Sequence, residues 1–277
     1  MINSKSYHSF TKSSFRSAKH STYFNVYDEI FSKYKGKNIV FVEIGVLSGG
    51  SLFMWRDFFG PEARIIGIDY NPNARKWIES GFEIYIGDQS DPEFWRGFLK
   101  NVGHIDVVLD DGGHTYEQQI VTAECLYSSI NDGGTIAIED THTSYMRGFG
   151  PRRYSFIEYS KNLIDRINFR YSELNNLQAD RRIWSIRFYE SVVSFHIDRK
   201  STAIISSPID NGGIADGAKD FRFKNLDAFD EKGSLVSRTF HFLLNSDYKL
   251  LKFLKSFFKG IIMSYSFKAK KYFTSVE

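Results

Sequence analysis

The stretch Lys37-Asn-Ile-Val-Phe-Val-Glu-Ile-Gly-Val-Leu-Ser-Gly-Gly-Ser51 runs from an apolar segment directly into a glycine-rich turn. Residues 39–44 are mainly β-branched or aromatic, which predicts a buried strand. Gly45 and Gly49 then let the backbone come close to a ligand, and residues 50–59 begin a helical pattern whose N-terminus faces the same place. A strand, a glycine turn and a helix in this order indicate a nucleotide site, with an ordinary strand-to-helix turn as the alternative.

Composition predicts a globular protein. The 277 residues suffice for one large domain with appendages or for two small domains, and a hydrophobic content of 42% supplies a packed core. The single cysteine, Cys125, excludes an internal disulfide and a cysteine-based metal site, which fits a reducing compartment. Residues 1–20 contain no apolar block typical of a signal peptide, and no apolar run reaches membrane-spanning length. We therefore expect a cytoplasmic protein.

The net charge of +3 is unevenly distributed. Residues 1–27 contain four basic and no acidic residues, residues 248–276 contain seven lysines and no acidic residue, and the middle of the chain is acidic. This distribution argues against a nucleic-acid groove through the core. In residues 248–263, apolar side chains share one helical face and lysines the opposite face. The segment 246–272 is therefore predicted to contact the inner face of an anionic membrane, with docking on the protein's own core or on a second subunit of a homo-oligomer as the alternative.

The remaining periodicity predicts an α/β protein. Residues 1–20 are polar and serine-rich and predict a mobile arm, and residues 23–35 have apolar side chains at helical spacing. Further strands are expected at 64–69, 82–86, 105–109, 135–138, 183–189 and 192–197, and helices at 75–80, 92–100, 116–130 and 154–167. Because only Glu190 and Ser191 separate the last two strands, these strands should form an antiparallel hairpin. The pattern predicts a doubly wound, mostly parallel seven-stranded sheet that ends in this hairpin.

Acidic residues follow three of the predicted strands. Asp69 closes the strand at 64–69, where a carboxylate of a doubly wound sheet faces the ribose hydroxyls of an adenosine ligand. The strand at 105–109 continues into Asp110-Asp-Gly-Gly-His114, and the strand at 135–138 continues into Glu139-Asp-Thr-His142. Two strands therefore end in paired acids that are followed by a histidine.

Three of these motifs resemble one known family. Val42-Glu-Ile-Gly-Val46, Asp110-Asp-Gly-Gly-His114 and Glu139-Asp-Thr-His-Thr-Ser-Tyr145 are similar to the class I S-adenosylmethionine (SAM)-dependent methyltransferases. Within that class, the sequence resembles the metal-dependent sugar O-methyltransferases of the mycinamicin methyltransferase and cephalosporin hydroxylase-like group. The resemblance covers roughly residues 20–198, and the family usually has serine where Gly113 stands. It implies a Rossmann-like methyltransferase domain at 36–200, between an N-terminal arm and helix at 1–35 and a C-terminal extension at 201–277 that resembles no family we know.

The resemblance also implies a role for each candidate residue. The methionine end of SAM would be bound by Glu43, Gly45, Gly49 and Ser51, its ribose by Asp69, and its adenine by Asp88 and Gln89. Asp110 would also contact SAM, as would His20 and Tyr23, which belong to a segment that closes over the site. Asp88 is alternatively only the N-terminal cap of the next helix. The metal ligands would be Asp110, Glu139 and Asp140, and all-oxygen ligation favours Mg²⁺ or another divalent cation. His142 would be the general base, with His114 as its rival.

Together these roles predict O-methylation of a sugar hydroxyl. SAM carries an activated methyl group, a divalent cation polarises the acceptor hydroxyl, and a base removes its proton. The expected acceptor is a sugar in a surface polysaccharide precursor or in a glycosylated metabolite, and we expect no nucleic-acid partner. Alternatives are a cephalosporin-hydroxylase-like enzyme, a SAM- or nucleotide-binding protein without catalysis, and a membrane-associated scaffold. The acids favour an enzyme, because a simple SAM binder needs none of Glu139, Asp140 and His142.

Overall fold

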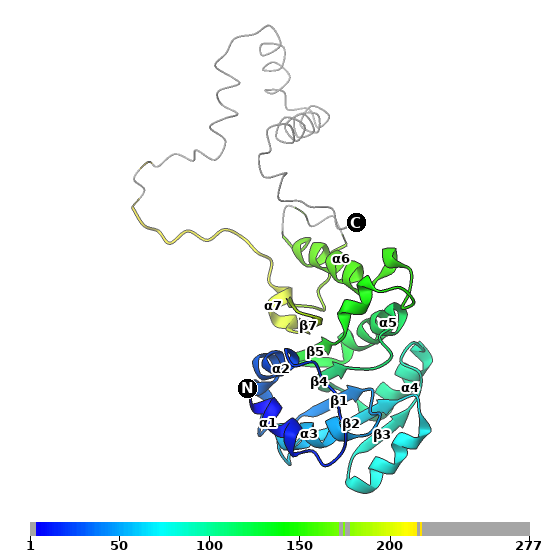
Figure 1. Ribbon diagram of the computed structural model, residues 1–277. Coiled ribbons are helices and arrows are strands. Elements are labelled where there is room, and N and C mark those ends of the chain that lie inside the picture. Colours follow the sequence, from blue (N-terminus) through cyan, green and yellow to red (C-terminus); the bar gives the residue numbers. More distant parts are fainter. Residues whose placement is uncertain (1–3, 172–173, 175–177, 215–216, 218–277) are drawn as a thin grey trace. The chain divides into compact units, whose positions relative to one another are not determined.

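The computed structural model of the protein describes residues 4–171, 174, 178–214 and 217 (Figure 1). The chain divides into two compact units, Met1–Pro208 and Ile209–Glu277. The predicted basic helix within residues 246–272 lies outside the described residues, so membrane contact through it stays a prediction, as do a homo-oligomer and a cytoplasmic location. In the described ranges, no helix is both long enough and apolar enough to cross a bilayer.

Within the described residues, seven strands form one sheet in the order β3-β2-β1-β4-β5-β7-β6. The first four pairs in this order are parallel, whereas β7 pairs antiparallel with both β5 and β6. The strands are β1 (Val40–Ile44), β2 (Arg64–Asp69), β3 (Glu83–Ile86), β4 (Ile105–Asp110), β5 (Ile130–Ile138), β6 (Ser185–Tyr189) and β7 (Val192–His196). The predicted doubly wound, mostly parallel sheet with its terminal hairpin is confirmed.

Helices cover both faces of this sheet (Figure 1). Because successive side chains of a strand point to opposite faces, Phe41 of β1 packs in a core with the first three helices, and Val42 packs in a core with the next three. The helices are α1 (Lys5–Lys12), α2 (Tyr23–Phe31), α3 (Gly50–Phe59), α4 (Pro92–Val102), α5 (Tyr116–Leu126), α6 (Phe156–Asn168) and α7 (Arg199–Ala203). The 3₁₀ helices are η1 (Ser32–Tyr34), η2 (Pro72–Ser80), η3 (Tyr127–Ser129), η4 (Thr141–Tyr145) and η5 (Arg152–Tyr154).

Residues 4–12 of the N-terminal segment pack against the domain, so the prediction of a mobile arm is wrong for this part of residues 1–20. Two of the serines in this segment, Ser6 and Ser9, are buried and hydrogen-bonded inside the protein. Ser6 Oγ donates to the carbonyl oxygen of Phe24 at 2.9 Å, and Ser9 Oγ donates to Asp57 at 2.6 Å. Small hydroxyl side chains therefore let α1 approach α2 and α3 closely, because each buried polar group has a partner.

Candidate active site

The carboxyl ends of β1, β2, β4 and β5 lie at one edge of the sheet, because these strands are parallel and pair in register. Ile44 pairs with Asp110 and Asp110 with Ile138, so the last residues of three neighbouring strands lie side by side. The residues that follow these strands therefore converge, as is typical of the ligand site of a doubly wound sheet.

A cavity of about 530 Å³, which we call the strand-edge cavity, opens at this edge. Gly45 lies in its wall with a φ of 92°, and a Cβ atom there would lie 2.0 Å from the carbonyl oxygen of Asp111. Only glycine therefore fits between the ends of β1 and β4. The cavity is lined by four of the predicted cofactor residues, Gly45, Asp69, Asp88 and Gln89, and also by Asp111, His114 and Asp140.

The carboxylate of Asp69 shapes the turn after β1. Its Oδ2 accepts hydrogen bonds of 2.9 Å from the backbone N–H groups of Val46 and Leu47, and its Oδ1 accepts one of 2.8 Å from Asn71. A carboxylate has about four acceptor positions, so Asp69 retains capacity for a ligand hydroxyl.

The alternative interpretation of Asp88 as a helix cap is wrong. Its Oδ1 accepts hydrogen bonds from the backbone N–H and the hydroxyl of Ser90, at 2.8 and 2.7 Å. The cap of α4 is Asp91, whose side chain accepts from the backbone N–H of Glu93 at 2.9 Å. Asp88 instead lies in the wall of the strand-edge cavity.

Three other predicted cofactor residues lie behind the cavity wall. The buried carboxylate of Glu43 accepts hydrogen bonds from Ser51 Oγ at 2.8 Å and from Trp55 Nε1 at 3.0 Å, which fastens α3 to β1. A Cβ atom on Gly49 would lie 2.2 Å from the ring of Trp77, so this glycine is required for packing. None of Glu43, Gly49 and Ser51 lines the strand-edge cavity, and their predicted contacts with SAM stay a prediction.

Asp110 is turned away from the other acids. Both of its carboxylate oxygens accept from Gln89 Nε2 at 3.0 Å, and burial raises the pKa of Asp110 to about 7. The next residue, Asp111, points to the opposite face, since successive side chains of an extended chain alternate. In the structure it is Asp111 that lies with His114 and Asp140, and that shares Lys19 with Glu139, whereas the predicted roles of Asp110 in metal and SAM binding stay predictions.

Lys19 lies at the centre of a cluster of carboxylates. Its Nζ atom is 2.6 Å from Asp111 Oδ2, 3.0 Å from Glu139 Oε2 and 4.0 Å from Glu43 Oε1, and its side chain is only 1% exposed. Burial alone would lower the pKa of this ammonium, but the negative charges of the three acids outweigh burial and raise the pKa well above its ordinary value. Lys19 is therefore a buried, fully charged ammonium.

Asp140 connects this cluster to three histidines. His114 Nε2 lies 3.2 Å from Asp140 Oδ2, and His20 Nε2 and His142 Nδ1 each lie 3.9 Å from Oδ1. The hydroxyl of Tyr23 donates a hydrogen bond of 2.5 Å to the same Oδ1. Among the residues that the structure describes, two sets of side chains are close enough to share a metal ion, Asp111 with His114 and Asp140, and His20 with Asp140 and His142. His20 and Tyr23 thus lie beside the acids, and neither lines the strand-edge cavity.

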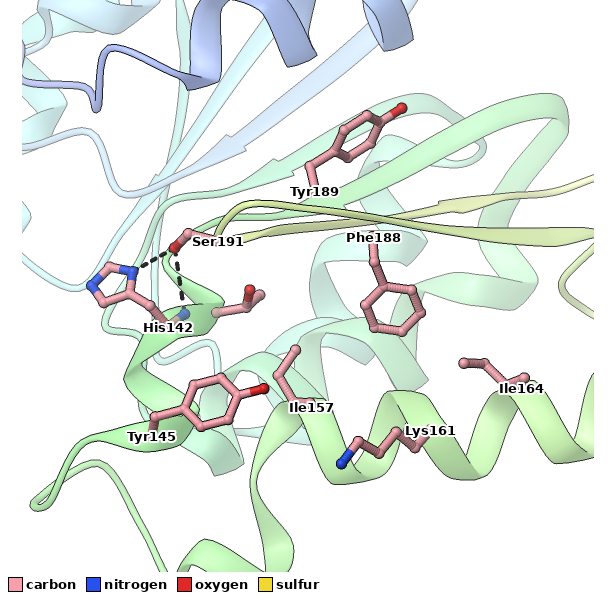
Figure 2. Close-up of a pocket in the computed structure, with 9 residues that line it drawn as sticks. His142, Tyr145, Ile157, Lys161, Ile164, Phe188, Tyr189 and Ser191 are labelled. Atoms are coloured by element: carbon pink, nitrogen blue, oxygen red, sulfur yellow. Dashed lines mark hydrogen bonds between the residues drawn. The ribbon is translucent and has the colours of Figure 1, made fainter. Parts of the chain in front are cut away.

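A second pocket, of about 480 Å³, has His142 in its wall and is bounded by η4, α6 and the β6–β7 hairpin (Figure 2). We call it the hairpin pocket. Figure 2 shows His142 beside Ser191 at one end, with the apolar side chains of Ile157, Phe188 and Ile164 along the rest of the pocket. The pocket is therefore polar where it meets the acid cluster and, apart from Lys161 on α6, mainly apolar beyond it.

Hydrogen bonds join His142 to the acid cluster. His142 Nδ1 makes a short hydrogen bond with Ser191 Oγ (Figure 2). The same Oγ atom lies 2.9 Å from the hydroxyl of Tyr23, which in turn is bonded to Asp140. Ser191 and Tyr23 therefore fix the orientation of the imidazole relative to the carboxylates.

Strained backbone is concentrated at these two cavities. Among the described residues, the non-glycine residues with a positive φ are Leu47 (44°), His114 (60°), Asp140 (54°) and Ser191 (62°). The first three line the strand-edge cavity and the fourth lines the hairpin pocket. Such conformations cost about 1 to 3 kcal/mol each and cluster at functional sites.

Lys19 and Ser191 belong to this site although no sequence pattern singled them out. Lys19 stands in a basic segment whose composition predicts solvent exposure, and nothing near it in the sequence indicates buried acids. Ser191 stands in the two-residue link of the hairpin, where a polar residue is expected for the turn alone. Only the pairing of β7 with β5 brings this turn to the end of β5.

Residues 42–141 match a known family that is described as a methyltransferase domain. Among curated proteins, the chain is 30% identical over 201 residues to the mycinamicin VI 2''-O-methyltransferase of Micromonospora griseorubida, covering 68% of this chain and 49% of that protein. It is 33% identical over 135 residues to the 8-demethyl-8-alpha-L-rhamnosyl tetracenomycin-C 2'-O-methyltransferase of Streptomyces olivaceus, covering 46% of this chain and 35% of that protein. The chain thus spans between a third and a half of the length of these relatives.

Solved structures agree with the sequence matches. The MycE methyltransferase of mycinamycin biosynthesis, in complex with Mg and SAH, superposes with a TM-score of 0.60 and 28% sequence identity, over 76% of this chain and 55% of that chain. A further MycE structure contains Mg, SAH and mycinamycin VI and superposes with a TM-score of 0.59.

The sheet order and the cavity at its carboxyl edge are those of the class I methyltransferase fold, and residues 42–141 match the methyltransferase-domain family. Within this class, the chain resembles the sugar O-methyltransferases of the mycinamicin group, as its motifs predicted.

Proposed function

We propose that the protein is a SAM-dependent, divalent-metal-assisted O-methyltransferase that acts on a sugar hydroxyl. The observation that carries this proposal is the cluster of Asp111 and Asp140 in the wall of the strand-edge cavity with Glu139 buried beside them at Lys19, and with His114 lining that cavity and His142 lining the hairpin pocket. The similarity to proteins named as sugar O-methyltransferases, and to a structure that contains Mg and SAH, supports the same reaction.

The strand-edge cavity suits the cofactor. Its volume of about 530 Å³ lies in the range of small-molecule sites, and it lies at the carboxyl ends of parallel strands. Asp69 offers its remaining acceptor position to a ribose hydroxyl of SAM, and Asp88 lies in the same wall, where we place the adenine. Gly45 keeps the wall open, since any side chain there would meet Asp111.

The acids suit a divalent cation. Asp111 and Asp140 lie close enough to His114 to share a metal ion, Glu139 is joined to Asp111 through Lys19, and the hard oxygen ligands of the three acids favour Mg²⁺. When bound, such a cation would lower the pKa of a coordinated sugar hydroxyl, and SAM would supply an activated methyl group. We assign no ligand role to Asp110, because Gln89 holds both of its oxygens.

The chain's own residues position the acceptor and take its proton. With its proton on Nδ1, His142 donates to Ser191 Oγ, and Nε2 is then an unprotonated base for the hydroxyl of the acceptor. Tyr23 holds Ser191 and Asp140 together, so the imidazole and the acids keep their relative positions. His114, on the side of the strand-edge cavity, is the rival base.

The hairpin pocket suits the acceptor. Its polar end at His142 matches a sugar ring, and its apolar part at Ile157, Ile164 and Phe188 matches a hydrophobic group attached to that sugar. We therefore propose a sugar joined to an apolar group, which is either a glycosylated metabolite or a lipid-linked precursor of a surface polysaccharide.

A screen with methyl-labelled SAM tests this function. The full-length protein is incubated with Mg²⁺ and separate panels of glycosylated aromatic metabolites, lipid-linked sugars and nucleotide-linked sugars. We expect a labelled O-methyl group on a sugar of the first or second panel, located by tandem mass spectrometry. The control is Phe188→Glu, which should lose transfer to apolar glycosides while SAM binding stays unchanged. Transfer to nucleotide-linked sugars alone would contradict the proposed acceptor class, and no SAM binding would contradict the function.

A further inference from the structure

A positively charged side chain bridges two acids of the proposed cation site. The Lys19 ammonium contacts Asp111 Oδ2 at 2.6 Å and Glu139 Oε2 at 3.0 Å, and these atoms belong to two of the three acids assigned to the divalent cation. The Lys19 side chain is nearly inaccessible to solvent, and Tyr27 contacts the other oxygen of Glu139. The acids are thus neutralised by a group of the chain itself.

The ammonium and a divalent cation compete for the same oxygen atoms. Mg²⁺ binds carboxylate oxygens at about 2.0 to 2.1 Å, so a cation held between Asp111 and Glu139 would take the position beside Asp111 Oδ2 and Glu139 Oε2 that the ammonium now fills. Two positive charges in direct contact with the same carboxylates also repel each other, and burial strengthens this repulsion because little water screens it. Lys19 and the cation therefore cannot both occupy the centre of the cluster.

We propose that Lys19 is an internal counter-ion that fills the divalent-cation site of the unloaded protein and leaves it when the cation binds. This inference rests on the proposed metal-assisted function. It makes cation binding a displacement, so the measured affinity for the cation is lower than the affinity of the same acids without the ammonium.

The surrounding chain allows this displacement. Phe15 anchors the segment before Lys19, because its ring packs at 4.5 Å from the ring of Trp77, and α2 anchors it after Lys19. Residues 16–18, between Phe15 and Lys19, are largely accessible to solvent. Lys19 can therefore swing out on its flexible four-carbon side chain while both anchors stay in place. Ala18 lines the strand-edge cavity, so movement of Lys19 also affects the wall that faces the proposed cofactor.

Two measurements on the full-length protein test this inference, and neither depends on turnover. Isothermal titration with Mg²⁺, and with Mn²⁺ as a tighter-binding probe, is compared between the wild type, Lys19→Met and the control Lys12→Met. Lys12 lies in the same segment and pairs with Asp57 at the surface, so its replacement removes one positive charge far from the acids. We expect Lys19→Met to bind the cation at least ten-fold more tightly than either of the other proteins.

The second measurement needs no substitution and therefore remains decisive if Lys19→Met does not fold. Lysines of the wild type are labelled by reductive methylation with and without saturating Mg²⁺, and the peptide with Lys19 is quantified by mass spectrometry. We expect Lys19 to be protected without the cation and to become reactive with it.

Equal or weaker cation binding by Lys19→Met, or a Lys19 that stays protected at saturating Mg²⁺, would overturn this inference and leave the proposed function standing. If neither the wild type nor Lys19→Met binds a divalent cation, both the inference and the metal-assisted function are wrong. A loss of SAM binding in Lys19→Met with unchanged cation affinity would make Lys19 a cofactor residue and would also overturn the inference.

Discussion

Replacing Asp111 with asparagine should weaken cation binding, whereas the same change at the adjacent Asp110 should not. The two side chains point to opposite faces of the sheet. Asp111 contacts the Lys19 ammonium in the acid cluster, whereas Asp110 is hydrogen-bonded to Gln89 on the other face. Asparagine is a conservative replacement for Asp110, because a carboxyl with a pKa of about 7 is already partly neutral at neutral pH.

The structure sets the size of the effect. Two unit charges 4 Å apart interact by about 4 kcal/mol at an effective dielectric constant of 20. The Asp111 side chain is 22% exposed, so solvent screening reduces this interaction, and the neutral amide still offers one oxygen ligand. We therefore expect Asp111→Asn to lose about 2 kcal/mol of cation binding, which is roughly a 30-fold increase in Kd.

Isothermal titration with Mn²⁺ on the purified variants measures this difference, and thermal unfolding checks that both variants fold. A 30-fold weaker Kd for Asp110→Asn together with an unchanged Kd for Asp111→Asn would refute the assignment of faces. An unchanged Kd in both variants would show that neither acid binds the cation.

Three further predictions concern the base, the cofactor and the buried acid. His142→Ala should keep its affinity for SAM and cation while turnover falls by roughly 10² to 10⁴, and if only His114→Ala loses turnover, the base assignment is reversed. Asp69→Ala should bind SAM at least about ten-fold more weakly by titration, because an unpaired ribose diol costs about 1 to 3 kcal/mol, and unchanged affinity in a folded variant would remove our placement of the ribose. The folded-state pKa of Asp110 is raised to about 7 from an unfolded value near 3.9, so its contribution to stability is complete below about pH 4 and is lost as pH rises through about 7. In urea unfolding between pH 4 and 8, this group should make the free energy of unfolding fall by up to about 1.4 kcal/mol per pH unit, and Asp110→Asn should reduce this dependence on pH. An identical dependence of the free energy of unfolding on pH in the variant would contradict the raised pKa.

The sheet and the location of the site were predictable because they depend on local patterns. Short β-branched segments that alternate with helical ones predict a parallel sheet, and the carboxyl ends of parallel strands must meet at one edge. The predicted cavity residues Gly45, Asp69, Asp88 and Gln89 follow such strand ends and do line one cavity. Their positions at the ends of predicted strands were sufficient to place them in one site, because no contact between distant parts of the chain had to be known.

The choice between Asp110 and Asp111 needed more than the motif. Both follow the same strand, and only the alternation of side chains separates them: Leu109 faces the core with α2 and α3, so Asp111 shares that face and Asp110 does not. Counting this alternation back from the buried residues of β4 could have found Asp111, provided that the strand continues regularly to its end.

The contribution of the N-terminal segment could not be predicted from composition. Lys19 and Tyr23 reach the acids of β4 and β5 from positions about one hundred residues away, at separations of 92 and 117 residues. Their burial depends on the packing of α1 and α2 against the domain, and a serine-rich basic sequence is equally typical of a solvated arm.

Dependence of sugar methylation on a divalent cation tests the central claim most directly. The acceptor identified in the screen is incubated with methyl-labelled SAM and protein freed of metal by chelation, and Mg²⁺ is then added back to the wild type and to Glu139→Gln. The account predicts no transfer after chelation, full recovery in the wild type on adding Mg²⁺, and little recovery in Glu139→Gln at the same concentration. Undiminished transfer in the presence of excess chelator, or equal recovery in Glu139→Gln, would contradict the account.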